Sequence, residues 1–507
     1  MRILTIPCPS IILSLTMCVA LTSGCAMGPD YVAPEIDVPT AWESKHTTAT
    51  ERAIQSTWWT NFGDTQLNAL VDEALQHNDD LAVAMANVDA SRAQLGIATS
   101  YLFPTIGLDG GSYRSRPSDN GATPPLPTDQ ANSLHSVSGG ISFELDLWGK
   151  YRRGQEAVKA SLLATEASYA TIRLAVISQT VEGYFTLLSA DNQLAIAKRT
   201  LASRYESEKL RKERFELGVT TELDYRQAQA ETAATIATVR QLEQAVSAAE
   251  TSLSVILGRS PRVLITSTPD RGLNLALLDV PADIPAGLPA SLLSRRPDIA
   301  AAAQGLHAAT AMIGYTEADL LPAISLSGLL GFESLQLSNL LESTSKTWTY
   351  GAGLSMPIFT FGRTLAQIEE AKATQRGAVA TYKKTVRTAF AEVKIALVAT
   401  EKTRDIATAY AEQVLALGRT LKLAKDQYES GVSDFLTVLD AERGLLQAQL
   451  TLVEAQRARL SAVVSLCKAL GGGWSLDDLA TPVMSDVPSS TSAAPSSMTE
   501  QAAQAGE

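Results

Sequence analysis

The sequence is poor in the residues from which most enzyme and metal sites are built. Histidine occurs four times in 507 residues, at positions far apart: His46, His77, His135 and His307. A metal site made of histidines is therefore disfavoured, because such a site needs several ligands close together. The sequence also has no HExxH, P-loop or GxSxG motif and no cluster of Cys and His. These absences argue against an enzyme.

A surplus of basic residues and a long apolar run are also missing. Lys and Arg number 42 against 54 Asp and Glu, giving a net charge of −12. This charge argues against a nucleic-acid partner, because phosphate binding needs an excess of Lys and Arg. Beyond the leader described below, no apolar run reaches about 18 residues, so no membrane-spanning helix is expected.

Cysteine is scarce, and three of the four cysteines lie within the first 25 residues. Residues 1–24 carry Arg2, an apolar stretch over residues 11–21 and then small residues, which predicts a signal peptide. The sequence LTSGC around Cys25 resembles a bacterial lipobox, so Cys25 is the expected lipidation site, with simple cleavage near Cys25 as the alternative. Cys467 lies among apolar residues, which predicts a buried, unreactive thiol.

Long helical stretches and short alternating segments make up the rest of the chain. Residues 64–103 have the pattern of one helix, which Pro104 ends. Alternation over residues 136–147 predicts a strand of about 11 residues with one polar and one apolar face, the length of a tilted membrane strand. Residues 149–217 contain no proline and predict a helix ~100 Å long. A globular core needs no helix of that length.

Two similar turns interrupt the helical stretches. Residues 214–230 (RFELGVTTELDYRQAQA) and 427–443 (QYESGVSDFLTVLDAER) match, with Gly218 opposite Gly431 and Thr220 opposite Ser433. Glycine is favoured just beyond a helix C-terminus, and Ser433 is the expected N-cap of the following helix. Each stretch therefore predicts a tight turn between two antiparallel helices.

A second internal match extends this pairing. Residues 298–328 align with residues 80–110, so that Gly96 pairs with Gly314 and Pro104 with Pro322. In the second half, strands are predicted within residues 324–332 and 348–356, and helices over 362–430 and 433–470. The chain is therefore an internal duplication, with each half running as helix, two strands, very long helix, turn and return helix.

This pattern implies an assembly. Four strands cannot close a barrel, and an open sheet edge is not viable in lipid. Several copies of the chain must therefore share their strands in one barrel and their long helices in one tube, with the polar strand face lining water. The expected fold class is mixed: all-α together with a membrane β-barrel.

The sequence resembles the outer-membrane factors, the TolC-like exit ducts of Gram-negative tripartite efflux and secretion systems. It is most similar to the lipoprotein branch that serves pumps of the resistance-nodulation-division (RND) type. The resemblance is carried by CAMGPDYVAP (25–34), WWTNFGDTQLNAL (58–70), RRPDIAAA (295–302) and both Gly-Val turns. It implies a homotrimer with a twelve-stranded β-barrel, four strands per chain, which continues into a long periplasmic α-helical barrel.

The resemblance also implies where the protein lies and what it meets. It would be lipid-anchored in the cell outer membrane, with a periplasmic adaptor (membrane fusion) protein and an inner-membrane RND-type pump as partners. No cofactor is expected beyond the covalent lipid on Cys25. The expected segments are the signal peptide (1–24), the anchored N-terminal and belt segment (25–63), helix (64–103), strand pair (104–148), long helix, tip and return helix (149–258), equatorial connection (259–294), helix (295–321), strand pair (322–360), long helix, tip and return helix (361–471) and the C-terminal belt segment with a disordered tail (472–507).

The resemblance assigns a periplasmic aperture to Leu436 and Asp440, an apolar ring beside an acidic one. Because they are four residues apart, both point the same way from one helix. Three carboxylates around a narrow pore would repel anions and raise one another's pKa values. The simpler explanation is that Asp440 is an acid of the first turns, favoured by the helix dipole.

The resemblance assigns further roles beside the aperture. Asp224 matches an acidic residue on the other turn, and Tyr428 matches the tyrosine that hydrogen-bonds to it in the closed channel. Ser433 stands where some members have an arginine that completes this contact, and Arg443 is the expected substitute. The turns that would meet the adaptor comprise Gly218, Val219, Gly431 and Val432.

Two other functions fit part of this pattern. An outer-membrane channel for type I protein secretion shares the fold, and a structural lipoprotein could use the helices as a spacer without a pore. A spacer without a pore would not need strands with a lipid-facing apolar face. The lipobox favours efflux over protein export. The expected function is therefore an iris-gated exit duct that passes whatever its inner-membrane pump loads.

Overall fold

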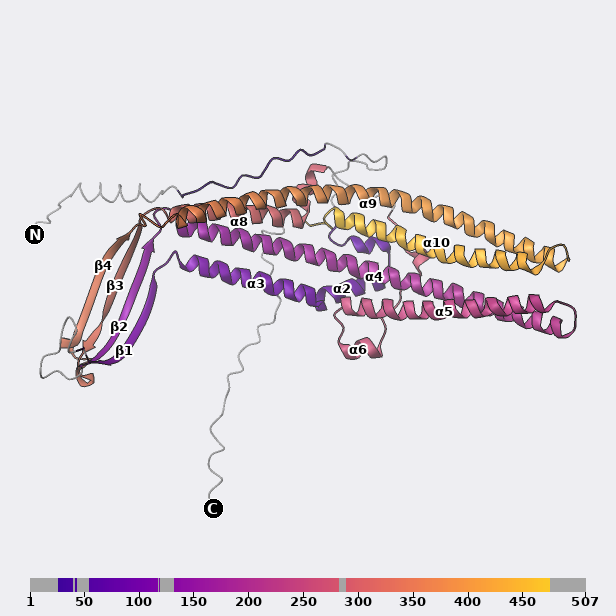
Figure 1. Cartoon of the computed structure of the whole chain (residues 1–507), viewed down its shortest axis with the longest axis horizontal. Helices are drawn as coiled ribbons and strands as arrows, with labels where there is room; N and C mark the ends of the chain where they lie inside the picture. Colours follow the sequence, from indigo (N-terminus) through magenta and orange to yellow (C-terminus); the bar gives the residue numbers. More distant parts are fainter. Residues whose placement is uncertain are drawn as a thin grey trace, which may run out of the picture.

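The computed structural model of the chain describes residues 26–39, 42, 54–116, 118, 132–281 and 289–474, so the expected signal peptide and Cys25 lie outside the described residues. Two similar halves follow one another in the chain (Figure 1). The first half contains α2 (Thr65–His77), α3 (Asp79–Ser100), β1 (Thr105–Ser115), β2 (Asn132–Leu145), α4 (Lys150–Glu216) and α5 (Glu222–Ile256). The second contains α8 (Pro297–Ala318), β3 (Ala323–Ser334), β4 (Lys346–Ser355), α9 (Arg363–Glu429) and α10 (Phe435–Ala469).

Short elements lie before, between and within these halves. They are η1 (Trp58–Phe62), α6 (Pro261–Thr266), η2 (Leu275–Leu277), η3 (Pro289–Ser291), α7 (Leu292–Arg295), η4 (Leu337–Asn339) and η5 (Ser343–Ser345).

The duplication predicted from the sequence is confirmed by helix lengths. α4 and α9 have 67 residues each, and α5 and α10 have 35 residues each. At 1.5 Å per residue, α4 and α9 are each ~100 Å long. Both helical turns lie at the end of the molecule farthest from the sheet (Figure 1). Among the helices that the structure describes, none combines the length and the apolar composition needed to cross a membrane.

The single helix predicted over residues 64–103 is wrong, because the structure divides it into α2 and α3 at Asn78. Asn78 has an extended backbone, and its side chain accepts a hydrogen bond from the Leu81 amide at 3.2 Å. This contact is an N-cap, which starts a new helix. The apolar periodicity continues through the break, so the sequence pattern alone did not reveal it.

The four strands form one antiparallel sheet in the order β1-β2-β3-β4. Its register places Leu108 opposite Gly139, Gly139 opposite Leu330, and Leu330 opposite Trp348. Residues paired across antiparallel strands share a face, and neighbours along a strand alternate between faces. The predicted apolar residues of all four strands therefore lie on one face of the sheet.

That apolar face is uncovered in the single chain. Leu108 is 81% exposed, and Tyr350 and Leu354 are more than 70% exposed. β1 and β4 are the two edges of the sheet, and each pairs with one neighbour only among the described strands. The sheet is thus an open ribbon with an exposed apolar face.

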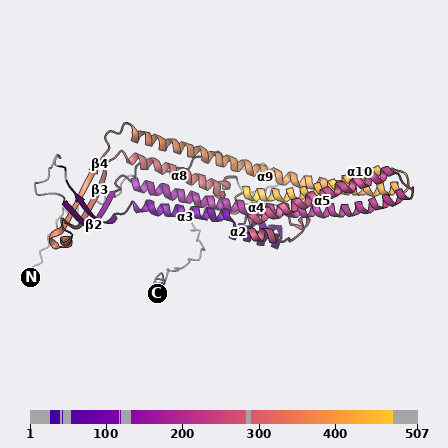
Figure 2. The same ribbon diagram turned by 60° about the horizontal axis from the view of Figure 1, so that its bottom comes forward.

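The helices nearest the sheet lie side by side in the order α3, α4, α8, α9 (Figure 2). Farther from the sheet, α4 pairs with α5 and α9 with α10 as two hairpins. The C-terminal end of α5 meets the start of α3, and the C-terminal end of α10 meets the start of α8. The Asn78 side chain donates to the Ile256 carbonyl at 2.8 Å, and the Arg296 side chain donates to the Ala469 carbonyl at 3.0 Å. The two halves thus satisfy helix-end carbonyls in the same way.

The main core lies where these helix ends meet. Its largest fully buried side chains include Trp58, Phe62 and Tyr184. The Tyr184 hydroxyl donates a 2.7 Å hydrogen bond to the buried Asp64 carboxylate, which also accepts from the Leu273 amide at 3.0 Å. These bonds connect the segment before α2, α4 and the connection after α5. The connection is therefore fixed against the helices by a buried polar contact.

Residues 26–39, called the strap below, connect the N-terminal side of the chain to the helices. The Gly28 backbone lies so close to Gly314 that a Cβ on Gly28 would be 2.4 Å from the Gly314 Cα. Arg153 of α4 donates to the Met27 carbonyl at 3.1 Å and to Asp30 at 2.6 Å. The strap is therefore held at the sheet-proximal ends of α4 and α8.

Candidate functional site

The two helical turns have the same backbone geometry. Gly218 and Gly431 have φ values of 71° and 76°, which glycine adopts without strain. The Val219 amide donates to the Arg214 carbonyl at 2.8 Å, and the Val432 amide donates to the Gln427 carbonyl at 2.9 Å. Together with the hydrogen bonds that the two glycine amides donate, these bonds form the Schellman motif. The predicted role of both glycines in ending the long helices is confirmed.

The predicted N-cap at Ser433 is wrong by one residue. Asp434 caps α10, and its carboxylate accepts from the Thr437 amide at 3.1 Å. In the first half, Thr221 caps α5 in the same way. The Ser433 hydroxyl is buried and has no hydrogen-bond partner among the described residues. Asp and Ser are equally good caps, so turn geometry decides between adjacent residues.

Leu436 and Asp440 lie on the first turns of α10, as expected from the resemblance. Leu436 is 44% exposed, although it follows the buried Phe435 directly. The Asp440 side chain is 64% exposed, and its carboxylate accepts from Arg443 at 3.2 Å. An exposed leucine and an exposed carboxylate therefore occupy one stripe of α10, available to line a surface beyond this chain.

A network of charged side chains lies behind that stripe. Arg443 also contacts Glu231 of α5, with 2.6 Å between Nε and the carboxylate. Glu231 accepts from the buried Arg204 of α4 at 3.0 Å, and Arg204 lies 3.5 Å from Glu442 of α10. Lys425 of α9 lies 3.1 Å from Glu442. The network joins all four helices of the two hairpins.

The expected contact between Tyr428 and Asp224 is not formed within one chain. The Tyr428 hydroxyl accepts a 2.7 Å hydrogen bond from Arg211 of α4, and Asp224 accepts from Thr220 at 3.2 Å. Nor does Arg443 substitute there, because its contacts among the described residues are with Asp440 and Glu231. Sequence reasoning did not identify Arg211, which has no motif around it and lies 217 residues from Tyr428.

The outer surface of both turns is apolar and uncovered. Val219 is 72% exposed and Val432 is 76% exposed, and Leu217 and Leu223 beside the first turn are also exposed. Exposed valines at equivalent positions of two turns form a repeated apolar feature at one end of the molecule.

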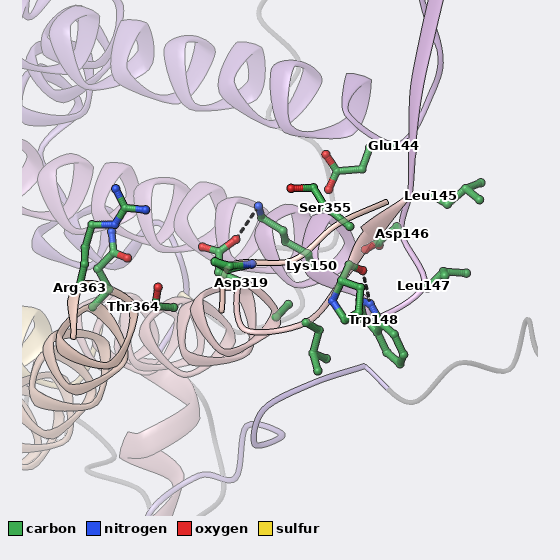
Figure 3. Close-up of a pocket in the computed structure, with 16 residues that line it drawn as sticks. Glu144, Leu145, Asp146, Leu147, Trp148, Lys150, Asp319, Ser355, Arg363 and Thr364 are labelled. Carbon is green, nitrogen blue, oxygen red and sulfur yellow. Dashed lines mark hydrogen bonds and ion pairs between the residues drawn. The ribbon is translucent and has the colours of Figure 1, made fainter. Parts of the chain in front are cut away.

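At the opposite end, the junction of sheet and helices forms a half-open pocket of about 340 Å³ (Figure 3). Lys150 at the start of α4 lies 2.6 Å from Asp319, which follows α8. The Trp148 indole donates to the Pro322 carbonyl at 2.8 Å. These contacts connect the two halves where their strands leave the helices, so the junction fixes the sheet on the helical body.

The described residues offer no group of three or more His, Cys, Asp and Glu that could hold a metal ion. Cys467 is a free thiol within the main core, and burial raises its pKa to about 12. A thiol of such high pKa is unreactive at neutral pH, which confirms the expectation for Cys467.

Comparison with known proteins gives the family. The sequence matches the outer membrane efflux proteins over residues 70–259 and 288–472. It is 34% identical to the outer membrane protein OprJ of Pseudomonas aeruginosa over 90% of this chain and 95% of OprJ. The fold is similar to the CmeC outer membrane channel of Campylobacter jejuni, with a TM-score of 0.83, 28% identity and coverage of 89% and 96% of the two chains. It is also similar to the open state of the MtrE outer membrane channel of Neisseria gonorrhoeae, with a TM-score of 0.79, 30% identity and coverage of 89% and 98%. The chain therefore belongs to the family of outer membrane efflux proteins.

Proposed function

We propose that three copies of this chain form the exit duct of a tripartite efflux pump. In this assembly the sheets close a twelve-stranded barrel in the outer membrane, and the helices continue it as a periplasmic tube. Substrates enter from an inner-membrane transporter of the RND type through a periplasmic adaptor protein. They leave through the barrel to the exterior.

The observation that carries this proposal is the open sheet. Its apolar face is exposed, and both of its edges lack a second partner among the described strands. An open edge is not tolerated in a bilayer, because unpaired backbone groups have no water to bond. Pairing β4 of one copy with β1 of the next removes every edge and turns the apolar face towards lipid.

The aperture of the duct is proposed at Leu436 and Asp440. Their exposed stripe on α10 would face the axis of the tube, where three copies place an apolar ring next to an acidic ring. Arg443 lies beside Asp440 within the same chain, so it partly neutralises the acidic ring. The remaining negative potential favours cations over anions in the narrowest part of the pore.

The adaptor is proposed to dock on the two turns. Gly218 and Gly431 end the long helices, and the exposed side chains of Val219 and Val432 project beyond them. With two such apolar turns per chain, a trimer would offer six similar contact sites to the adaptor. Apolar tips rimmed by charged residues are a usual form of protein interface.

A lipid on Cys25 is proposed as the membrane anchor. Cys25 directly precedes the strap. The strap begins beside Gly149, where a Cβ would be 2.9 Å from the Ala26 Cα. Gly149 lies between β2 and α4, so Ala26, the first described residue of the strap, lies close to the end of the proposed barrel, which supports a membrane anchor on the residue before it.

The proposal is tested by deletion, complementation and crosslinking. Loss of the gene should sensitise the cell to a subset of a broad toxicant panel, and the intact gene should restore resistance. In Val219→Cys and Val432→Cys variants, a thiol-directed crosslinker should capture one periplasmic adaptor protein. Ile265→Cys, on the exposed α6, is the matched control and should not capture it. Unchanged sensitivity to every toxicant, together with equal crosslinking at all three positions, would contradict the proposal.

A further inference from the structure

Arg211 forms a contact between the two hairpins close to the turns. It belongs to α4, and its side chain is almost fully buried. Its guanidinium carbon lies 4.5 Å from the ring centroid of Tyr428 and 4.3 Å from that of Phe435. One of its terminal nitrogens also donates to the Tyr428 hydroxyl at 2.7 Å. The cation of one hairpin is thus held by two aromatic rings of the other.

The charge of Arg211 has no carboxylate in direct contact. Among the described residues it forms no ion pair, although Asp224 and Glu442 are near enough to interact with it electrostatically. Burial and the nearby charge of Arg214 lower the pKa of Arg211, against the effects of Tyr428, Asp224 and Glu442. Its buried Nε has no hydrogen-bond partner in the described part of the chain. The contact is therefore incompletely satisfied, and such a contact breaks more readily than a full salt bridge.

The two rings connect Arg211 to the aperture. Tyr428 lies in the last turn of α9, and Phe435 is the first residue of α10. Phe435 is 2% exposed and directly precedes Leu436. A displacement of the α10 backbone that takes Phe435 away from Arg211 therefore also moves Leu436, and with it the stripe that contains Asp440.

A pocket that is half open to the surface lies next to this contact. It has a volume of about 450 Å³ and lies between α4 and the turn of α9 and α10. Arg211, Tyr428 and Phe435 all line it. The hairpins are thus not packed solidly on that side of the contact.

We propose that Arg211 is a positioning residue that holds the second hairpin against α4 and keeps the aperture narrow. This inference rests on the proposed aperture at Leu436 and Asp440. Separation of Tyr428 and Phe435 from Arg211 is the step within one chain that lets α10 move outward. Arg211 does not itself line the pore; it acts through the two aromatic rings.

The test is single-channel conductance in planar bilayers. Arg211→Met keeps an apolar chain of similar length but removes the charge and the donor. It should raise the conductance several-fold. Arg211→Lys should give an intermediate value, because an ammonium cannot lie flat between two rings. Tyr428→Phe keeps the ring and removes the hydroxyl alone, so it should produce a smaller rise.

The double variant Arg211→Met/Tyr428→Phe should conduct no more than Arg211→Met, because both changes break one contact. Lys212→Met, next to Arg211 on α4 at a position that is 57% exposed, is the matched control and should conduct as the wild type does. Thermal melting and native mass establish that each variant folds and assembles. If Arg211→Met does not assemble, Arg211→Lys decides the question, because it keeps the charge but loses the flat contact with the two rings.

Leu436→Gly separates failure of this inference from failure of the aperture. Wild-type conductance in Arg211→Met, with increased conductance in Leu436→Gly, overturns the role of Arg211 and leaves the aperture standing. Unchanged conductance in both overturns both. Additive effects of Arg211→Met and Tyr428→Phe would also overturn the proposal, since they would show two independent contacts.

Discussion

Arg443 of α10 lies against Glu231 of α5, 212 residues earlier in the chain, with 2.6 Å between Nε and the carboxylate. The Glu231 side chain is 11% exposed and is also bonded to Arg204, which is 4% exposed. One carboxylate thus balances two arginines from different helices. Because Arg204 is buried, breaking this pairing should lower the stability of the protein more than breaking an exposed ion pair of the same hairpins.

Glu231→Gln should therefore destabilise the protein. The change leaves the buried Arg204 without its full counter-charge, which typically costs about 3 kcal/mol or more when no other group compensates. Glu442 compensates partly at 3.5 Å from Arg204, so a loss of about 2 kcal/mol is expected. Thermal melting in detergent measures it. Glu222→Gln, whose exposed partner is Arg226, is the control and should change stability by less than about 0.5 kcal/mol.

Asp440→Asn should change ion selectivity. Removing the proposed acidic ring lowers the negative potential at the narrowest point, so the permeability ratio of cations to anions should fall several-fold. Reversal potentials under a salt gradient measure this ratio. Asp405→Asn, an exposed carboxylate in α9, is the comparison. Equal selectivity in both variants and the wild type would favour the simpler explanation, an acid near a helix N-terminus.

Leu330→Arg should impair membrane assembly, whereas Leu329→Arg should impair it far less. The two residues are adjacent in β3 and point to opposite faces. Leu330 lies in the apolar row with Leu108 and Trp348. Arginine on a lipid-facing position near the barrel midplane costs about 2–4 kcal/mol per chain. The yield of heat-resistant oligomer in the outer membrane measures the difference, and an equal loss from both variants would argue against lipid on that face.

The strap should detach in acid. Glu156 is hydrogen-bonded to His307 at 2.8 Å and to Arg153 at 2.8 Å, and the His307 ring stacks on Tyr31 of the strap. Arg153 also pairs with Asp30 of the strap. Burial raises the pKa of Glu156, but its bonds to His307 and Arg153 outweigh burial and bring it below the ordinary value of 4.5. This stabilisation is complete above pH 4.5 and is lost as the pH falls through the lowered pKa.

Limited proteolysis within residues 26–39 measures strap detachment. Cleavage should increase as the pH falls below 4.5, and Glu156→Gln should show increased cleavage already at neutral pH. Glu243→Gln, which removes an ion pair between α5 and Lys198 of α4, is a control away from the strap. If cleavage in the Glu156→Gln variant matched the wild type at neutral pH, Glu156 would have no role in holding the strap.

Local patterns in the sequence predicted the main elements of the fold. The absence of proline over residues 149–217 predicted α4, and alternation predicted which strand residues share a face. Gly218 and Gly431 marked the turns because their backbone conformation favours glycine. The break at Asn78 was missed because the apolar periodicity of α2 runs on into α3. The N-cap at Asp434 was missed because Ser433 is an equally good residue type.

Site residues could be predicted only where a local motif carried them. Leu436 and Asp440 were assigned from the family resemblance, and their role at the aperture stays a prediction. Arg211 was not found, since its partners Tyr428 and Phe435 belong to the other half of the chain and only the folded structure brings them together. The hydrogen bond that the resemblance implied between Tyr428 and Asp224 is not formed within one chain, where the Tyr428 hydroxyl accepts from Arg211 and Asp224 accepts from Thr220.

The central claim is that three chains share one barrel and one tube. Cryo-electron microscopy of the full chain in lipid nanodiscs tests it most directly. The map should contain three copies around a water-filled axis, with β4 of each copy paired to β1 of the next and α10 closest to the axis at the far end. A map with a single copy, or with the long helices packed into a solid bundle, would contradict the claim.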